Sequence, residues 1–189
     1  TSASYKTATG TNALGSVTTG NYNTGIGRNS GSAITTGVQN TAVGSNAADA
    51  LSTGSYNVAI GYEALTNDTK GSRSTALGRG TLVSQNFTSA TDAYNVAVGF
   101  NAGNSTTTGV YNTLVGSLSG DAITDGERNT GVGFGTMTNQ TTVDNNTAVG
   151  YYVLQANVAG SRNTAVGSQS LYNMTQSSAT NTYNTAVGY

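Results

Sequence analysis

A five-residue string, Asn-Thr-Ala-Val-Gly, recurs along almost the whole chain and constrains its fold more than any other feature. It stands unaltered at residues 40–44, 163–167 and 184–188. With degenerate copies included there are eleven, which begin at Lys6, Asn23, Asn40, Asn57, Ser74, Asn95, Asn112, Asn129, Asn146, Asn163 and Asn184. Eight of the ten intervals are 17 residues and the other two are 21. A period this short and strict predicts a solenoid, in which each coil contacts only its neighbours.

The fifth position of every copy is glycine, counting the Asn as position 1. These glycines are Gly10, Gly27, Gly44, Gly61, Gly78, Gly99, Gly116, Gly133, Gly150, Gly167 and Gly188. An unbroken glycine column indicates a corner that needs positive φ, or a place where a side chain would collide with the next coil.

Positions 2 to 4 read as a short β-strand. Thr, Ala and Val alternate with a period of two, and the β-branched residues favour strand. The rest of the coil often carries a small residue and then a larger apolar one, followed by a second turn. We therefore expect an all-β fold, a parallel β-solenoid of about eleven 17-residue coils with two short strands each. At about 4.8 Å per coil the rod would be roughly 50 Å long.

The Asn column at position 1 predicts a ladder of side-chain amides. Each amide would bond to the next coil and satisfy turn amides, which is a structural role. The ladder residues are Asn23, Asn40, Asn57, Asn95, Asn112, Asn129, Asn146, Asn163 and Asn184.

Two orientations of the strand are open. Either the small Ala column faces inward and the Thr and Val columns face outward, or the reverse holds. We favour the first because a flattened coil has little room inside. The position-4 column would then be an exposed apolar ribbon and a natural oligomer seam. It consists of Val43, Ile60, Leu77, Val98, Val115, Val132, Val149 and Val166.

Two copies, Asn57-Val58-Ala59-Ile60-Gly61 and Asn95-Val96-Ala97-Val98-Gly99, resemble the repeat of YadA-type trimeric autotransporter adhesin heads. The Thr-rich copies also resemble repeats in bacteriophage tail fibres and in bacterial surface proteins. The resemblance covers residues 6–189. It implies a left-handed parallel β-roll, a homotrimer and an extracellular place on a virion or a cell surface. The coil is longer than is usual for those heads, and no coiled-coil stalk, neck or membrane anchor is evident.

Two coils, residues 74–94 and 163–183, carry four extra residues each and have similar inserts. We read a duplicated five-coil block within a single solenoid domain, residues 1–189, that is a fragment of a longer fibre. Insertions in solenoids form loops that often bind ligands. Exposed rings beside amides suit sugars, so the candidate glycan contacts are Tyr94, Phe87, Asp92, Tyr172, Asn173 and Tyr183. The alternatives are loops without a ligand and rings that only pack coil on coil.

The composition argues against catalysis. The chain has neither His nor Cys, so the common triads and zinc sites are excluded, and we expect no enzyme, no cofactor and no metal. Asp121, Asp125 and Glu127 form the densest acidic group, on one presumed turn. Seven scattered Lys and Arg predict no nucleic-acid partner, and no apolar run is long enough for membrane insertion.

These features favour a structural or adhesive fibre segment that attaches to host or surface glycans. Three alternatives stay open: a self-assembling filament without a ligand, an ice-binding solenoid and a glycan depolymerase. The Thr column suits ice, although ice-binding proteins usually show two Thr ranks.

Overall fold

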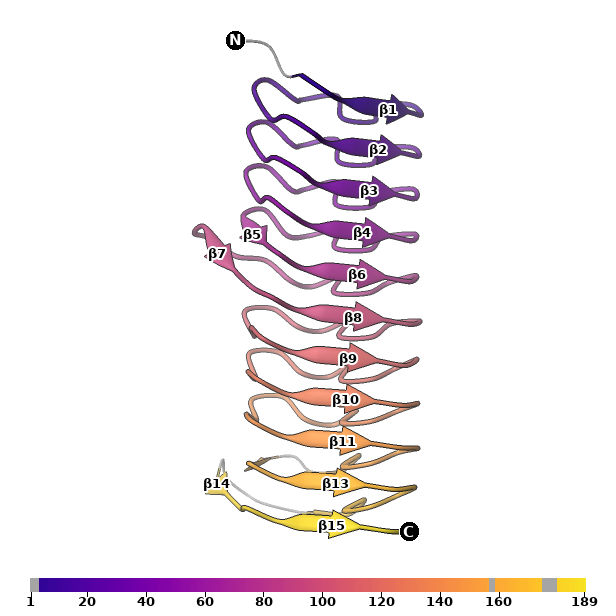
Figure 1. Cartoon of the computed structure of the whole chain (residues 1–189), viewed down its shortest axis with the longest axis vertical. Coiled ribbons are helices and arrows are strands. Elements are labelled where there is room, and N and C mark those ends of the chain that lie inside the picture. Colours follow the sequence, from indigo (N-terminus) through magenta and orange to yellow (C-terminus); the bar gives the residue numbers. More distant parts are fainter. Residues whose placement is uncertain (1–3, 157–158, 175–179) are drawn as a thin grey trace.

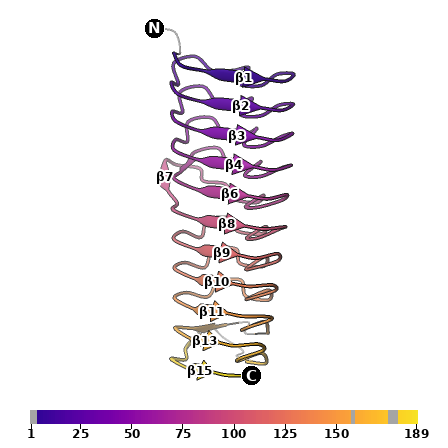
Figure 2. The ribbon, with the colours of Figure 1, turned by 45° about the vertical axis from the view of Figure 1, so that its right-hand side comes forward.

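The protein is described here by a computed structural model that covers residues 4–156, 159–174 and 180–189. In these residues the chain winds into a parallel β-solenoid of about ten turns, and they contain no helix (Figure 1). The coils lie one above another along the whole rod, which Figure 2 shows from a second direction. The all-β solenoid expected from the repeat is therefore confirmed.

The rod is built on one sheet of eleven parallel strands, each three residues long. The strands are β1 (Thr7–Thr9), β2 (Thr24–Ile26), β3 (Thr41–Val43), β4 (Val58–Ile60), β6 (Thr75–Leu77), β8 (Val96–Val98), β9 (Thr113–Val115), β10 (Thr130–Val132), β11 (Thr147–Val149), β13 (Thr164–Val166) and β15 (Thr185–Val187). Equivalent positions pair throughout, as in Ala42 with Ala59. The register also passes unchanged across both long coils, where β6 pairs with β8 and β13 with β15.

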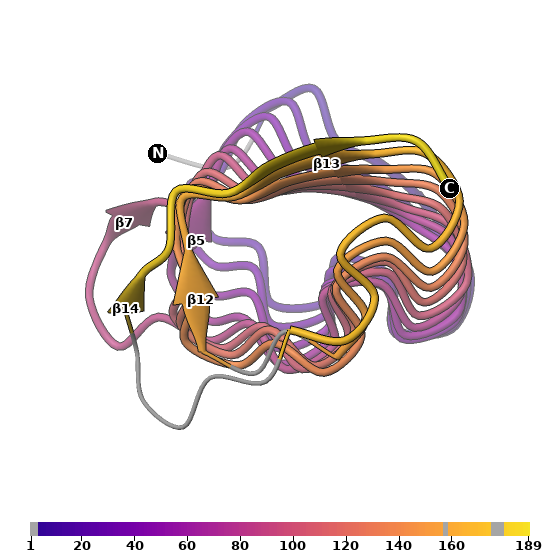
Figure 3. The ribbon, with the colours of Figure 1, turned by 90° about the horizontal axis from the view of Figure 1, so that it is seen from below.

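The expectation of two strands per coil is wrong for most coils. Among the described residues a second strand occurs only where a long coil pairs with the coil before it. These pairs are β5 (Gly71–Ser72) with β7 (Thr91–Asp92) and β12 (Gly160–Ser161) with β14 (Thr180–Asn181). The other half-coils are turns. Their backbone alternates into the left-handed region at positions 7 and 9, as at Glu63 (φ 55°) and Leu65 (φ 54°), and this interrupts extended structure. In Figure 3 β7 and β14 stand outside the stack.

The Ala column faces inward, which confirms the favoured orientation. Ala42, Ala59, Ala76, Ala97, Ala148 and Ala165 are fully buried. They pack in one core with larger side chains from the turns, among them Leu51, Leu65, Leu82 and Leu154. Small residues on the strand side of the core and large ones on the turn side allow close packing in a thin coil.

Exceptions to the Ala column are compensated across the core. Leu114 replaces Ala in one coil, and the positions that face it are Gly103 and Gly120, where a Cβ would lie within 3.0 Å of the Leu114 side chain. Conversely, Gly131 stands in the Ala column opposite Met137, whose Cε would lie 2.7 Å from an added Cβ. Volume is thus balanced coil by coil.

Both predicted reasons for the glycine column hold. The backbone φ at the corner is between 114° and 138° in every copy. A Cβ on Gly44 would lie 2.5 Å from the carbonyl oxygen of Gly61 in the next coil. The coils therefore approach more closely at this corner than any side chain permits.

Candidate interaction surfaces

The position-1 Asn side chains form an interior ladder that joins successive coils. Asn40 Nδ2 donates to Asn23 Oδ1 at 3.2 Å and to the Gly54 carbonyl at 2.9 Å. Its own Oδ1 accepts from both the backbone and the side-chain amide of Asn57. From Asn112 to Asn163 each Oδ1 likewise accepts the backbone amide of the next Asn in the column. The Nδ2 groups of Asn129, Asn163 and Asn184 also donate to the preceding Oδ1. Each buried amide thus satisfies groups of two neighbouring coils, which is a scaffold role.

At Ser74 the ladder is interrupted and Gln85 restores the connection. Gln85 Nε2 donates to Ser74 Oγ at 3.0 Å, and its Oε1 accepts from Asn95 Nδ2 at 2.9 Å. Gln85 also donates to Asp68 Oδ2, and Asp68 Oδ1 accepts backbone amides of Gly71 and Phe87. This buried network ties the first insert to the coil beneath it, and the sequence offered no signal for it beyond the missing Asn.

The outer face of the sheet carries the Thr and Val columns. Side chains at positions 2 and 4 are half-buried or exposed, and Ile26, Leu77 and Val132 are each 37–42% exposed. All the residues predicted as an oligomer seam lie in this one outward column. The β-strands therefore present a flat ribbon with an apolar column along the rod.

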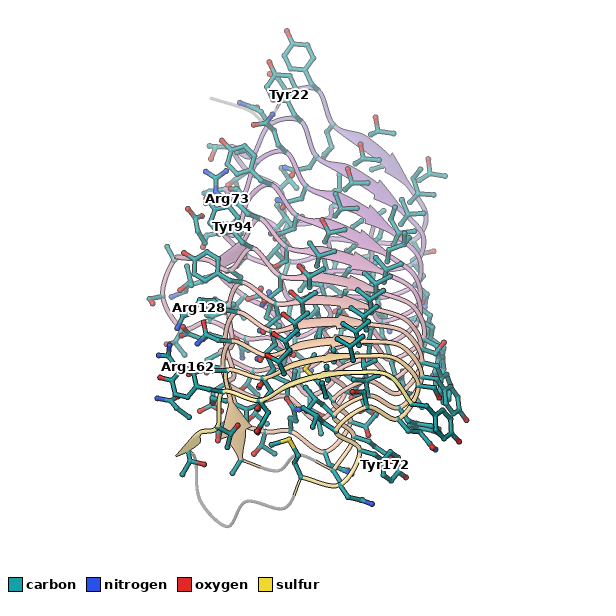
Figure 4. The ribbon with its side chains drawn as sticks, turned by 60° about the horizontal axis from the view of Figure 1, so that its bottom comes forward. Tyr22, Arg73, Tyr94, Arg128, Arg162 and Tyr172 are labelled. Carbon is teal, nitrogen blue, oxygen red and sulfur yellow. The ribbon has the colours of Figure 1, made fainter. Side chains whose placement is uncertain are left out.

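A column of Tyr and Arg lies along one edge of this ribbon, at the last residue of each coil (Figure 4). This residue is position 17 in the regular coils and position 21 in the two long ones, and the set is called the position-17 column. Arg73 lies between Tyr56 and Tyr94, with its Cζ 4.7 and 5.7 Å from the two ring centroids. Tyr94 in turn stacks on Tyr111 at 5.6 Å. The ion pair with Asp92, 3.1 Å away, raises the pKa of Arg73. One guanidinium and three rings are therefore stacked over four successive coils.

A second aromatic column lies just beyond the glycine corner, at position 6. Arg79 contacts the rings of Tyr62 and Phe100. Further along, Phe134 stacks on Tyr151 at 5.8 Å, and Tyr152 meets both rings edge to face. Tyr152 lies where a side chain on Gly135 would be, so this glycine makes room for the cluster.

The six candidate glycan contacts do not form one site. Tyr94, Asp92, Tyr183 and Asn173 are exposed, but Tyr94 has its two ring faces covered by Arg73 and Tyr111. Tyr172 is half-buried and lies apart from the position-17 column (Figure 4).

Phe87 was expected on the surface, and that expectation is wrong. Its side chain is only 6% exposed. The ring packs over Gly71, whose missing Cβ leaves the space, so the insert folds its one large apolar residue inward.

The three carboxylates of the acidic group have different surroundings. Asp121 is half-buried and its pKa is raised by burial, whereas Asp125 is exposed and Glu127 pairs with Arg128 at 2.8 Å. Across the described residues there is no pocket and no group of three acidic side chains that could hold a metal ion. The same residues contain no helix long and apolar enough to cross a membrane.

Comparison with known protein families, with curated proteins and with solved structures finds no match for this chain. Its surfaces are therefore interpreted from their own chemistry.

Proposed function

We propose that this chain is a structural and adhesive fibre segment: a left-handed β-roll of eleven coils, packed as a homotrimer and exposed outside the cell or on a virion, as in adhesin heads or phage tail fibres. The observation that carries the proposal is the continuous outward column of Val, Ile and Leu on a sheet of eleven strands in register. A straight apolar ribbon on a rod is a surface that a second copy of the same rod can cover along its full length.

The dimensions of the ribbon indicate what the interface must include. Ten steps of about 4.8 Å and a column spacing of about 7 Å give an area of roughly 350 Å². A standard interface buries about 800 Å² per partner. The seam must therefore also recruit residues beyond the Thr and Val columns of the sheet.

The assembly is tested by light scattering coupled to size exclusion. The wild type is expected at three times the chain mass of 19.0 kDa. Val98→Asp places a charge in the middle of the seam and is expected to give monomers, because an unpaired buried charge costs several kcal/mol. Thr142→Asp, at an exposed position on the turn side of the coil, is the matched control and is expected to stay trimeric. A wild-type monomer would contradict the trimer, and equal behaviour of the two variants would contradict the placement of the seam on the Val column.

Attachment to glycans follows from the exposed aromatic residues that a trimer leaves at its outer surface. A pyranose ring needs a free aromatic face. Tyr183, which Arg162 covers on one side, and the cluster of Phe134, Tyr151 and Tyr152 are therefore better candidates than Tyr94, whose two ring faces are both covered. Binding to surface polysaccharide is measured by biolayer interferometry. Tyr151→Ala and Tyr183→Ala are expected to weaken it, and Tyr94→Ala to leave it unchanged. Binding that is lost only with Tyr94→Ala would overturn this assignment.

Ice binding is the second candidate, because the same outer face holds a Thr column at the regular strand spacing, at Thr24, Thr41, Thr75, Thr113, Thr130, Thr147 and Thr164. A trimer would cover these hydroxyls, so the two functions exclude each other. Thermal hysteresis that disappears on Thr113→Lys, in a chain that stays monomeric, would favour ice binding over the fibre.

A further inference from the structure

Two pairs of tyrosines on adjacent coils are stacked face to face in the position-17 column. The rings of Tyr5 and Tyr22 are 4.8 Å apart and tilted by 2°, and those of Tyr94 and Tyr111 are 5.6 Å apart and tilted by 10°. All four side chains are exposed, by 45% to 74%. Their backbones share left-handed φ values of 51–60°, so the rings leave successive coils in the same direction.

We propose that these two pairs are modification sites, at which a haem peroxidase with hydrogen peroxide joins neighbouring coils by a dityrosine bond. Each phenol gives up one electron and its hydroxyl proton. The two radicals then form one carbon–carbon bond between the ring carbons next to the hydroxyls. The hydrogen on each of these carbons moves to the phenolic oxygen and restores both phenols. The two electrons and two protons reduce one hydrogen peroxide to two waters.

The structure supports coupling at these places and not elsewhere in the column. Arg73 separates Tyr56 from Tyr94, and Gln39 occupies the coil between Tyr22 and Tyr56. In the position-6 column the stacked partner of Tyr151 is Phe134, which has no hydroxyl to oxidise. Tyr151 and Tyr152 also approach, but they are neighbours in sequence, so a bond between them would not join two coils.

Such a bond would supply what the composition lacks. The chain has no cysteine, so no disulfide can tie one coil to the next. Coil-to-coil contacts otherwise consist of non-covalent hydrogen bonds, apolar core packing and ring contacts. In a solenoid each interface is held locally, and a covalent tie at Tyr5–Tyr22 would resist separation of the coils it joins.

The full chain, as an equal mixture of isotopically light and heavy protein, is treated with peroxidase and limiting hydrogen peroxide. Dityrosine fluorescence should appear with the loss of two hydrogen masses per bond. Lys6 lies between Tyr5 and Tyr22, so trypsin should leave the peptides 1–6 and 7–28 joined. After unfolding, chymotrypsin cuts at Phe100 and should leave the peptides of Tyr94 and Tyr111 joined. Light–light and heavy–heavy pairs are expected, because the bonds form within one chain.

Variants make the assignment specific. Tyr22→Phe and Tyr111→Phe should each remove one joined peptide and about half of the fluorescence, since the pairs are far apart and independent. Gln39→Tyr should add bonds to Tyr22 and Tyr56, because it closes the gap in the column. Oxidised wild type should unfold at a higher temperature than the oxidised double Tyr→Phe variant. Light–heavy pairs alone, bonds that map to Tyr56 in the wild type, or no coupling where free tyrosine couples, would each overturn the proposal.

Discussion

Replacing one amide in the middle of the Asn ladder should open the rod at a single interface. Asn129 is fully buried. Its Nδ2 donates to Asn112 Oδ1 and to the Val143 carbonyl, and its Oδ1 accepts the backbone amide of Asn146. Asn129→Ala leaves the Asn146 amide and the Val143 carbonyl buried without these partners. Each orphaned group costs about 1–3 kcal/mol, so we expect a loss near 3 kcal/mol in the free energy of unfolding.

The assay is chemical unfolding followed by circular dichroism, at one protein concentration because association shifts apparent stability. Asn139→Ala is the matched control, since Asn139 is exposed and should change stability by less than about 0.5 kcal/mol. Hydrogen exchange should show lost protection in the strands β10 and β11 on either side of the altered coil, with the distant β2 and β3 unaffected. If Asn129→Ala unfolds at the same denaturant concentration as Asn139→Ala, the ladder does not carry the stability assigned to it.

Three further variants test the glycine corner, the half-buried carboxyl of Asp121 and the core. Gly44→Ala forces a Cβ against the Gly61 carbonyl at positive φ and should lower stability by at least about 2 kcal/mol in thermal unfolding. Gly15→Ala should be tolerated, because its only close contact is with the exposed side chain of Asn12, which can move. Asp121 has a pKa raised above its ordinary value of 3.8, so its charged form destabilises the fold as pH rises. Asp121→Asn should therefore melt higher than wild type at neutral pH, and the difference should vanish below pH 3.8. Leu114→Ala should create a cavity beside two glycines and cost about 2–5 kcal/mol in chemical unfolding, and a loss below 1 kcal/mol would show that the coil collapses to fill it.

The sequence predicted the features that repeat with the coil. The Gly corner, the Asn ladder and the inward Ala column each involve one residue type in one environment, so periodicity alone reveals them. The loss of the second strand in most coils was missed, because left-handed φ at non-glycine residues such as Glu63 and Leu65 leaves no composition signal.

The residues whose burial or contacts the sequence did not predict are those whose surroundings occur in one coil alone. Phe87 resembled an exposed loop residue, but it is buried because the insert folds over Gly71. Gln85 replaces a missing ladder amide from another part of its own coil, which becomes visible only in three dimensions. The pairing of Tyr, Arg and Phe along the two columns likewise needed the stack, because residues 17 apart become neighbours there.

The two inserts have a consequence for spacing. Because the sheet register crosses both long coils unchanged, β7 and β14 emerge on the same side of the rod (Figure 3). The distance between these projections is then set by how many whole turns separate them, in increments of about 4.8 Å. Deleting or duplicating one 17-residue unit would move one projection by one coil along the axis, so the number of regular coils sets the spacing between the two inserts.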